Sequence, residues 1–401
     1  MEIKPLSEVA VIDISGVDKK AKENEHEIKL CNFTDVYYNW AVSRDNLDSF
    51  MIATANKNEI ERLLLKKGSV AITKDSETRD DIGIACYIAD DLDNTLLGYH
   101  CALIVPKKGI LDGKYLNAYL HTKMARNYFS NQASGSGQRY TLTIGGIGAV
   151  KIPIISYDDQ IKIGKIFSKI DSKITNNNKI NAELESMAKT LYDYWFLQFE
   201  FPNEEGKPYK SSGGKMVWNE ELKREIPENW ENSTLSKVSN MYQPKTFDAK
   251  LLDDNGIFRV YGAGGYMGQY NKFNHAQSEV FISCRGSCGN VYKSMPFSLI
   301  TGNAMIVHSA DERLFNYLYL TLLRIGVKNC ITGSVQPQIT RDSLNDWKLV
   351  VPNAELIVKF NQIISPLLKK QEEIINENQE LTSLRDFLLP MLMNGQVTFK
   401  S

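Results

Sequence analysis

The chain has 401 residues, of which 43% are apolar and 24% are charged, as is typical of a globular protein with two to three domains. No window approaches the roughly 18 consecutive apolar residues of a membrane helix, and the start lacks the cationic and apolar regions of a signal peptide. Six scattered cysteines are typical of reduced thiols. We therefore expect a cytoplasmic protein that does not bind a membrane. With a formal net charge of −1, any nucleic-acid binding must come from local patches.

Residues 1–155 have the pattern of a mixed α+β domain. Short apolar runs at 69–73 and 84–88 are bounded by Gly, Asp and Ser, and they predict strands. The aromatic-rich segment 114–130 predicts one helix between such strands. The sequence SGSGQRYT (134–141) predicts a loop that presents polar and charged side chains on a glycine frame.

Residues 156–230 are predicted to form a long helix followed by a connector. Apolar residues recur at alternating steps of four and three residues, which is the pattern of a coiled-coil seam. This first seam contains Ile163, Phe167, Ile170, Ile174, Asn181, Leu184 and Leu191. From residue 201 onward the composition turns to Gly, Ser, Pro and charged residues, which indicates a passive connector with turns.

A second mixed α+β domain is predicted over 231–352 and a second long helix over 353–401. The strand signals lie at 279–283 and 304–307, the helix signal at 311–325, and a polar loop, TGSVQPQIT, at 332–340. Each long helix should span 33–38 residues, or about 50 Å at ~1.5 Å per residue. The second seam contains Phe360, Ile364, Leu367, Ile374, Asn378, Leu381 and Leu388.

The two halves of the chain repeat each other. NAELESMAKTLYDYW (181–195) matches NQELTSLRDFLLPML (378–392) at an offset of 197 residues, and upstream segments such as 102–106 and 304–308 keep the same order. Two unrelated amphipathic helices are the weaker interpretation, because both seams and their flanks correspond. We expect the helices to pack antiparallel, with Asn181 close to Asn378, so that the apolar C-terminal segment is one half of a helix pair.

The sequence also resembles a known family. The segments LYDYWFLQFEFPNEEGKPYKSSGGKMVWNEELKREIPENW (191–230) and LLPMLMNGQV (388–397) are similar to those of the specificity subunit of type I restriction–modification systems. The resemblance covers the whole chain, as two target-recognition domains that alternate with two conserved helical regions. It implies an α+β fold with two pseudo-symmetric domains separated by two long antiparallel coiled-coil helices.

In that family each domain reads one half of a bipartite, asymmetric site in double-stranded DNA. The resemblance further implies that the helices bind two methyltransferase (modification) subunits, and that restriction/translocase subunits join them. It implies no cofactor and no catalytic group in this chain, because S-adenosylmethionine, ATP and Mg²⁺ belong to the partner subunits.

The residues themselves show no catalytic motif. All twelve prolines are isolated, so the Pro-Pro motif of adenine methyltransferases is missing, and no GxxxxGK[ST] phosphate loop occurs. The five histidines and the CRGSC segment (284–288) do not have the spacing of a metal site, so none is predicted. A stand-alone, two-headed DNA-binding regulator stays open as the alternative, and copurification with a methyltransferase would exclude it.

Direct readout of DNA requires Arg, Lys, Asn or Gln at base edges and other cations at phosphates. The two glycine loops therefore supply the first candidates: Ser136, Gln138, Arg139 and Tyr140, and then Ser334, Gln336 and Gln338. A turn that only caps the preceding helix is an equally good interpretation of these loops. Weaker candidates, for each of which a solvated charged surface is the better interpretation, are Lys74, Arg79, Tyr261, Tyr266, Lys272, Arg285 and Lys293.

Overall fold

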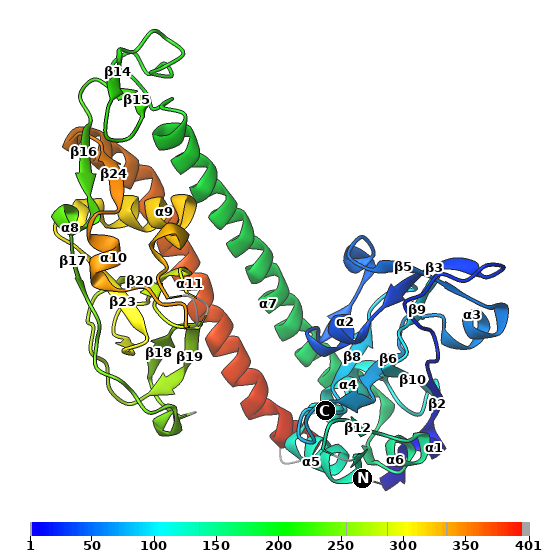
Figure 1. Cartoon of the computed structure of the whole chain (residues 1–401). Coiled ribbons are helices and arrows are strands. Elements are labelled where there is room, and N and C mark those ends of the chain that lie inside the picture. Colours follow the sequence, from blue (N-terminus) through cyan, green and yellow to red (C-terminus); the bar gives the residue numbers. More distant parts are fainter. Residues whose placement is uncertain (1, 136, 254, 287, 334–335, 395–401) are drawn as a thin grey trace. The chain divides into compact units, whose positions relative to one another are not determined.

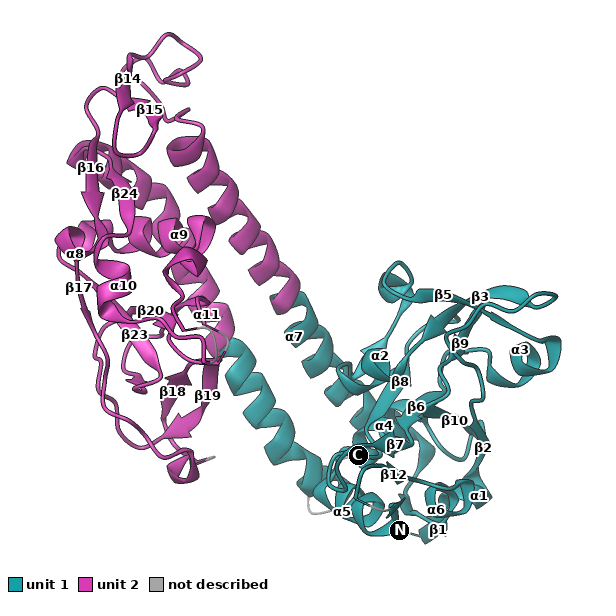
Figure 2. Cartoon of the chain, viewed as in Figure 1, with its two compact units in different colours: residues 1–177, 377–401 teal, residues 178–376 magenta. Residues whose placement is uncertain are grey.

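The computed structural model describes residues 2–135, 137–253, 255–286, 288–333 and 336–394. The chain divides into two compact units, one formed by residues 1–177 with 377–401 and the other by residues 178–376 (Figure 2). Each unit combines a globular part with segments of both long helices, whereas the predicted scheme treated the helical regions separately. No helix among the described residues is long and apolar enough to cross a membrane.

Unit 1 is built on a five-stranded sheet, and its strands β6 and β8, labelled in Figure 1, are buried along their whole length. Neighbouring strands are antiparallel except for the parallel pair β4 and β8. In spatial order the strands are β2 (Ala10–Ile14), β10 (Cys101–Pro106), β6 (Val70–Thr73), β8 (Ala85–Ile88) and β4 (Ala41–Val42). The predicted strands at 69–73 and 84–88 are thus confirmed as β6 and β8.

Three smaller sheets complete unit 1. They are β5 (Met51–Ala55), β3 (His26–Cys31) and β9 (Thr95–Leu97); β11 (Ser134–Gly135), β12 (Tyr140–Thr141) and β7 (Asp75–Ser76); and β1 (Glu2–Pro5) with β13 (Lys151–Ile154). The short helices are α1 (Leu6–Val9), α2 (Phe33–Tyr37), α3 (Lys57–Leu63), α4 (Gly113–Leu120), α5 (Lys123–Gln132) and α6 (Ile144–Gly148).

The single helix predicted over 114–130 is wrong, because α4 and α5 are separate. Thr122 has an extended backbone, with φ −65° and ψ 149°, and its hydroxyl accepts a hydrogen bond from the backbone N–H of Ala125. A threonine in this role is an N-cap, which begins a new helix. The hydrophobic pattern continues across the break and therefore does not reveal it.

Unit 2 repeats this plan in its globular part. Its larger sheet is antiparallel and contains, in spatial order, β17 (Ser239–Tyr242), β23 (Ala304–Ser309), β20 (Val280–Ser283) and β21 (Val291–Lys293). The smaller sheets are β19 (Gly265–Tyr270), β18 (Phe258–Gly262) and β22 (Leu299–Ile300); β16 (Glu231–Thr234) with β24 (Lys348–Val351); and the hairpin β14 (Met216–Asn219) and β15 (Arg224–Pro227). The short helices are α8 (Leu235–Val238), α9 (Phe315–Ile325) and α10 (Arg341–Asn345).

The internal repeat is visible in the order of these elements. β1, α1 and β2 open unit 1 as β16, α8 and β17 open the globular part of unit 2, and the first strand of each series pairs antiparallel with a late strand, β13 or β24. The predicted correspondence of 102–106 with 304–308 falls on β10 and β23, which occupy the second position of the larger sheet in both units. The predicted α+β fold with two pseudo-symmetric domains is confirmed.

The long helices are α7 (Tyr157–Tyr192) and α11 (Ala354–Met393), and each contributes to the core of both units. In unit 1, Ile163 and Phe167 near the start of α7 share a core with Leu389 and Leu392 near the end of α11. In unit 2, the end of α7 shares a core with the start of α11. The helix segments are therefore antiparallel in each unit, and the apolar C-terminal segment fills the core of the N-terminal unit.

The predicted seam residues lie on the inner faces of these helices. Ile163, Phe167, Ile170, Phe360, Ile364 and Ile374 are buried, and the other eight are half-buried. In unit 1 the side chain of Asn177, which is buried, donates a hydrogen bond of 2.8 Å to Oδ1 of Asn378. The asparagine that meets Asn378 within this unit thus lies one helical turn before Asn181. The predicted approach of Asn181 to Asn378 concerns residues of different units and stays a prediction.

Asp171 of α7 gives unit 1 a pH-dependent stability. Burial raises the pKa of this carboxyl to about 6, although the nearby Arg385 of α11 acts in the opposite direction. The folded state then binds more protons than the unfolded state between pH ~4 and ~6, so the free energy of unfolding falls as pH rises through this interval.

We expect Asp171→Asn to raise the stability of unit 1 at pH 8 by about 1–3 kcal/mol, because asparagine carries no charge to desolvate. At pH 3.5, where the wild-type carboxyl is protonated, the two proteins should unfold alike. Urea unfolding at both pH values, followed by circular dichroism, measures the difference. A wild-type protein that is more stable than the variant at pH 8 would contradict this assignment.

Candidate nucleic-acid interface

The small sheet of unit 1 brings together most of the DNA contacts predicted in this half. Strand β12 pairs with β11 on one side and with β7 on the other, so the loop between β11 and β12 lies next to Asp75 and Ser76. Gln138, Arg139 and the more distant Arg79 are exposed, and the Arg79 guanidinium lies 5.9 Å from the ring centre of Tyr140. Ser136 lies outside the described residues.

A glycine is required where this loop closes. A Cβ atom on Gly135 would lie 2.0 Å from the carbonyl oxygen of Arg139, which no side chain can tolerate. The aligned glycine of unit 2, Gly333, has φ +87°, and its Cβ would lie 2.6 Å from the carbonyl oxygen of Gln336. Both units therefore have a glycine at the same place, where the chain returns close to its own backbone, and helix capping alone does not require this.

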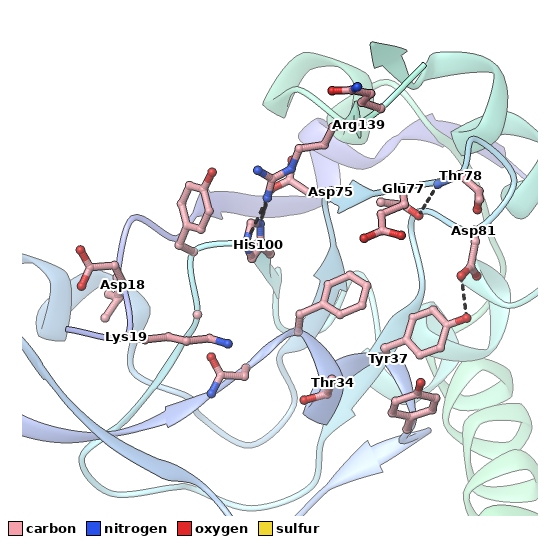
Figure 3. Close-up of a pocket in the computed structure, with 18 residues that line it drawn as sticks. Asp18, Lys19, Thr34, Tyr37, Asp75, Glu77, Thr78, Asp81, His100 and Arg139 are labelled. Atoms are coloured by element: carbon pink, nitrogen blue, oxygen red, sulfur yellow. Dashed lines mark hydrogen bonds and ion pairs between the residues drawn. The ribbon is translucent and has the colours of Figure 1, made fainter. Parts of the chain in front are cut away.

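The loop of unit 1 borders a cavity of about 950 Å³, which Figure 3 shows in close-up. Gln138 and Arg139 line it together with residues from α2, β7 and the segment before β10. Its charged lining groups are Asp18, Asp75, Glu77, Asp81, Lys19 and Arg139. Acidic groups outnumber basic ones, so the cavity favours hydrogen-bond donors over a phosphate.

A buried carboxylate organises the cavity wall. Asp75, whose side chain is 6% exposed, accepts hydrogen bonds from Thr141 Oγ1 at 2.6 Å and from Lys74 Nζ at 2.9 Å, and its Oδ2 lies 2.8 Å from His100 Nδ1. Burial alone would raise the pKa of Asp75, but the hydrogen bonds from Thr141, His100 and Lys74 outweigh it, and the pKa is lowered. Asp75 is therefore ionised at neutral pH.

Lys74 is part of this network and is not an open phosphate contact, since its side chain is only 9% exposed. Arg139 points toward the same network in Figure 3, with its Nη2 2.6 Å from His100 Nδ1 and 3.8 Å from Asp75 Oδ2. Tyr37 lies elsewhere on the cavity wall and donates a hydrogen bond of 2.6 Å to Asp81, which raises the pKa of the tyrosine. Sequence reasoning identified Arg139 but missed Asp75, His100 and Tyr37.

Unit 2 places Arg285 and Gln338 side by side. Their backbones form an isolated antiparallel bridge, and both line a smaller cavity of about 400 Å³ with Gln243 and Arg341. Gln338 also bridges to Thr332, which closes the loop that carries the exposed Gln336. Ser334 lies outside the described residues.

The remaining predicted contacts of unit 2 differ in accessibility. Tyr266 and Lys272 are exposed. Tyr261 is buried, and its hydroxyl accepts a hydrogen bond from the backbone N–H of Met295. Lys293 is largely buried and forms an ion pair of 2.7 Å with Glu372 of α11. Tyr261 and Lys293 are thus poorly placed to reach DNA, because each already has an internal structural partner.

Comparison with known proteins identifies the class of this two-unit molecule. The family model for the type I restriction modification DNA specificity domain matches residues 1–186 and 227–384. The chain belongs to this family of specificity subunits, the noncatalytic DNA-recognition components of type I restriction–modification systems.

Particular relatives resemble the chain over most of its length. It is 25% identical to the MjaIX specificity subunit of Methanocaldococcus jannaschii, over 89% of this chain and 86% of that one. It is 23% identical to the HindI specificity subunit of Haemophilus influenzae, over 83% and 87% of the two chains. A solved S subunit from M. genitalium shares the fold, with a TM-score of 0.60 and 17% identity over 100% of this chain and 96% of that one.

Proposed function

We propose that each unit reads one half of a bipartite, asymmetric site in double-stranded DNA. The observation that carries this proposal is the duplicated loop, in which Gly135 and Gly333 hold exposed side chains of the kinds that contact base edges. Two homologous but non-identical loops would read two different sequences. The protein would act in the cytoplasm, where chromosomal DNA is available to it.

Sequencing that detects DNA methylation, applied to a host with and without this gene, tests the proposal. We expect a modified motif of two short specific blocks separated by a spacer of fixed length, present only when the gene is intact. A single continuous motif, or no gene-dependent motif, would contradict the bipartite reading.

We further propose that the long helices bind two methyltransferase subunits, which restriction/translocase subunits then join. S-adenosylmethionine, ATP and Mg²⁺ would be bound by those partners. Two apolar side chains support this proposal: Met187 on α7 and Leu384 on α11 occupy equivalent places in the repeat, and each is about half exposed. Ile180, seven residues before Met187 on α7, extends this exposed apolar face, because a seven-residue interval keeps both side chains on one side of the helix.

We expect Met187→Asp and Leu384→Asp each to reduce the number of bound methyltransferase subunits from two to one. A buried, unpaired carboxylate at an apolar contact costs about 1–3 kcal/mol or more. Native mass spectrometry of the purified complex counts the subunits directly. The matched control is Lys369→Asp, which introduces the same side chain at an exposed polar position of α11. If the variant that carries both Met187→Asp and Leu384→Asp still bound two methyltransferase subunits, these residues would be excluded as docking positions.

A further inference from the structure

We propose that the cavity of unit 1 receives base edges of the DNA and that Arg139 reads a guanine there. In this proposal Asp75 holds the guanidinium of Arg139 in position through the imidazole of His100. This inference rests on the proposed function and deepens it, since it assigns a base and two roles to residues at one site. Four features of the cavity support it.

The charge of the cavity lining favours a base over a phosphate as the group bound there. Asp18, Glu77 and Asp81 line the cavity in addition to Asp75, and they outnumber the two cations Lys19 and Arg139. A phosphate in this field would be repelled, whereas base edges are neutral and carry amino donors that carboxylates accept. The guanidinium at this position therefore faces a base rather than the DNA backbone.

Arg139 combines a fixed position with free donors. Its side chain is 51% exposed, and its Nη2 contacts the imidazole of His100, while the guanidinium carbon lies 5.8 Å from the ring centre of Tyr99. A guanidinium carries five N–H donors in a planar fork, and this fork matches the O6 and N7 acceptors of guanine. Contact with His100 occupies one edge and leaves the other for a ligand.

His100 transmits the position of Asp75 to Arg139. Its Nδ1 lies 2.8 Å from the carboxylate of Asp75, and in the tautomer with the proton on Nδ1 this nitrogen donates to Asp75 and leaves Nε2 as the acceptor for Arg139 Nη2. The same ring is close to Arg139 Nη2 at both nitrogens, at 2.6 and 3.1 Å, so the guanidinium lies against the imidazole. Rotation of the imidazole would move the guanidinium with it.

Asp75 is itself held in place by its other donors. Thr141 binds one carboxylate oxygen and Lys74 binds the other, on a side chain that is almost entirely buried. Arg139 Nη2 and Asp75 Oδ2 lie 3.8 Å apart, an ion pair too long for a hydrogen bond, so Asp75 attracts the guanidinium directly and also holds it through His100. Asp75 is assigned as a positioning residue because its two carboxylate oxygens are already occupied by Thr141, Lys74 and His100.

The test uses the full chain assembled with its methyltransferase subunits and a series of DNA duplexes in which each base pair of the site is changed in turn. We expect Arg139→Gln to reduce the preference for guanine at one position of one half-site by ~5- to 150-fold, with other positions unchanged. The preference for adenine at that position should increase, because a glutamine side chain can form two hydrogen bonds with adenine. The matched control is Arg62→Gln, which removes an arginine that pairs with Asp13 at 2.7 Å outside the cavity.

Asp75→Asn should weaken the guanine preference at the same position, and it should cause no further loss when Arg139 is already glutamine. If Asp75→Asn destabilises unit 1, His100→Gln breaks the same connection while Thr141 and Lys74 still hold Asp75, and the same single-position loss is expected.

Different outcomes overturn different statements. Equal weakening of all DNA sequences by Arg139→Gln would make Arg139 a phosphate contact and overturn the inference. Additive losses from the Asp75 and Arg139 variants would remove the positioning role. A wild-type complex without any sequence preference would instead overturn the proposed function.

Discussion

Replacing both Leu389 and Leu392 by alanine is expected to unfold the N-terminal unit, although nearly 400 residues separate them from its first strand. The two leucines are 5% and 6% exposed and share a core with Ile163, Phe167 and the sheet residues of unit 1. A buried Leu→Ala substitution costs about 2–5 kcal/mol, and the total stability of a domain is about 5–15 kcal/mol. Even if the two losses are not additive, they remove most of this stability.

Hydrogen exchange of the purified chain measures this effect separately in each unit. We expect the protection of β6 and β10 in unit 1 to collapse in the double variant, while β20 and β23 in unit 2 keep theirs. Leu384→Ala is the control, because this leucine lies on the same helix but is half exposed. Retained protection in unit 1 would show that the C-terminal segment is dispensable for its core.

The second large effect is expected from the glycine loops. Gly135→Ala forces the backbone of Arg139 to move, because a Cβ atom would lie 2.0 Å from its carbonyl oxygen, and the base-contacting side chains move with it. Two lost base contacts of about 1–3 kcal/mol each would weaken specific binding by roughly a hundredfold or more. Gly333→Ala should act similarly on the other loop.

Competition binding of the assembled complex against its cognate and a scrambled duplex measures this loss. Gly16→Ala is the matched control, since its Cβ would make only an ordinary contact of 3.9 Å with Glu59. Both loop variants should lower the melting temperature by only a few degrees, because the strain that alanine introduces, about 1–2 kcal/mol, is confined to a loop and leaves the core intact. Cognate binding that is unchanged in both variants would show that the loops do not contact DNA.

The sequence predicts the architecture well because the repeat and the apolar seam can both be recognised from short stretches of sequence. Steps of four and three apolar residues define a helix face, and the match of 181–195 with 378–392 identifies the helices as equivalent. The pattern does not fix the register at single-residue precision. Asn177, which bonds to Asn378 in unit 1, occupies the seam as well as Asn181 does, and the sequence alone does not distinguish them.

The candidate site was harder to predict because its parts are distant in the chain. Arg139 and Gln138 carry a local signal, the glycine loop, whereas His100 reaches Asp75 only because β10 and β6 are neighbours in the sheet. The Lys-Asp dipeptide at 74–75 resembles a solvated surface in sequence, yet both side chains are buried against each other. The exposure of charged residues depends on tertiary packing. For this reason the ion pair between Lys293 and Glu372 could not be predicted from the sequence either.

The most direct measurement of the central claim is selection of binding sites from randomised DNA by the assembled complex, carried out with the wild type, Gly135→Ala and Gly333→Ala. Two separate blocks of specific bases are expected for the wild type, with the first variant losing one block and the second variant losing the other. If both variants lost the same bases, or if the wild type selected one uninterrupted block, the two units would not read separate halves of the DNA site.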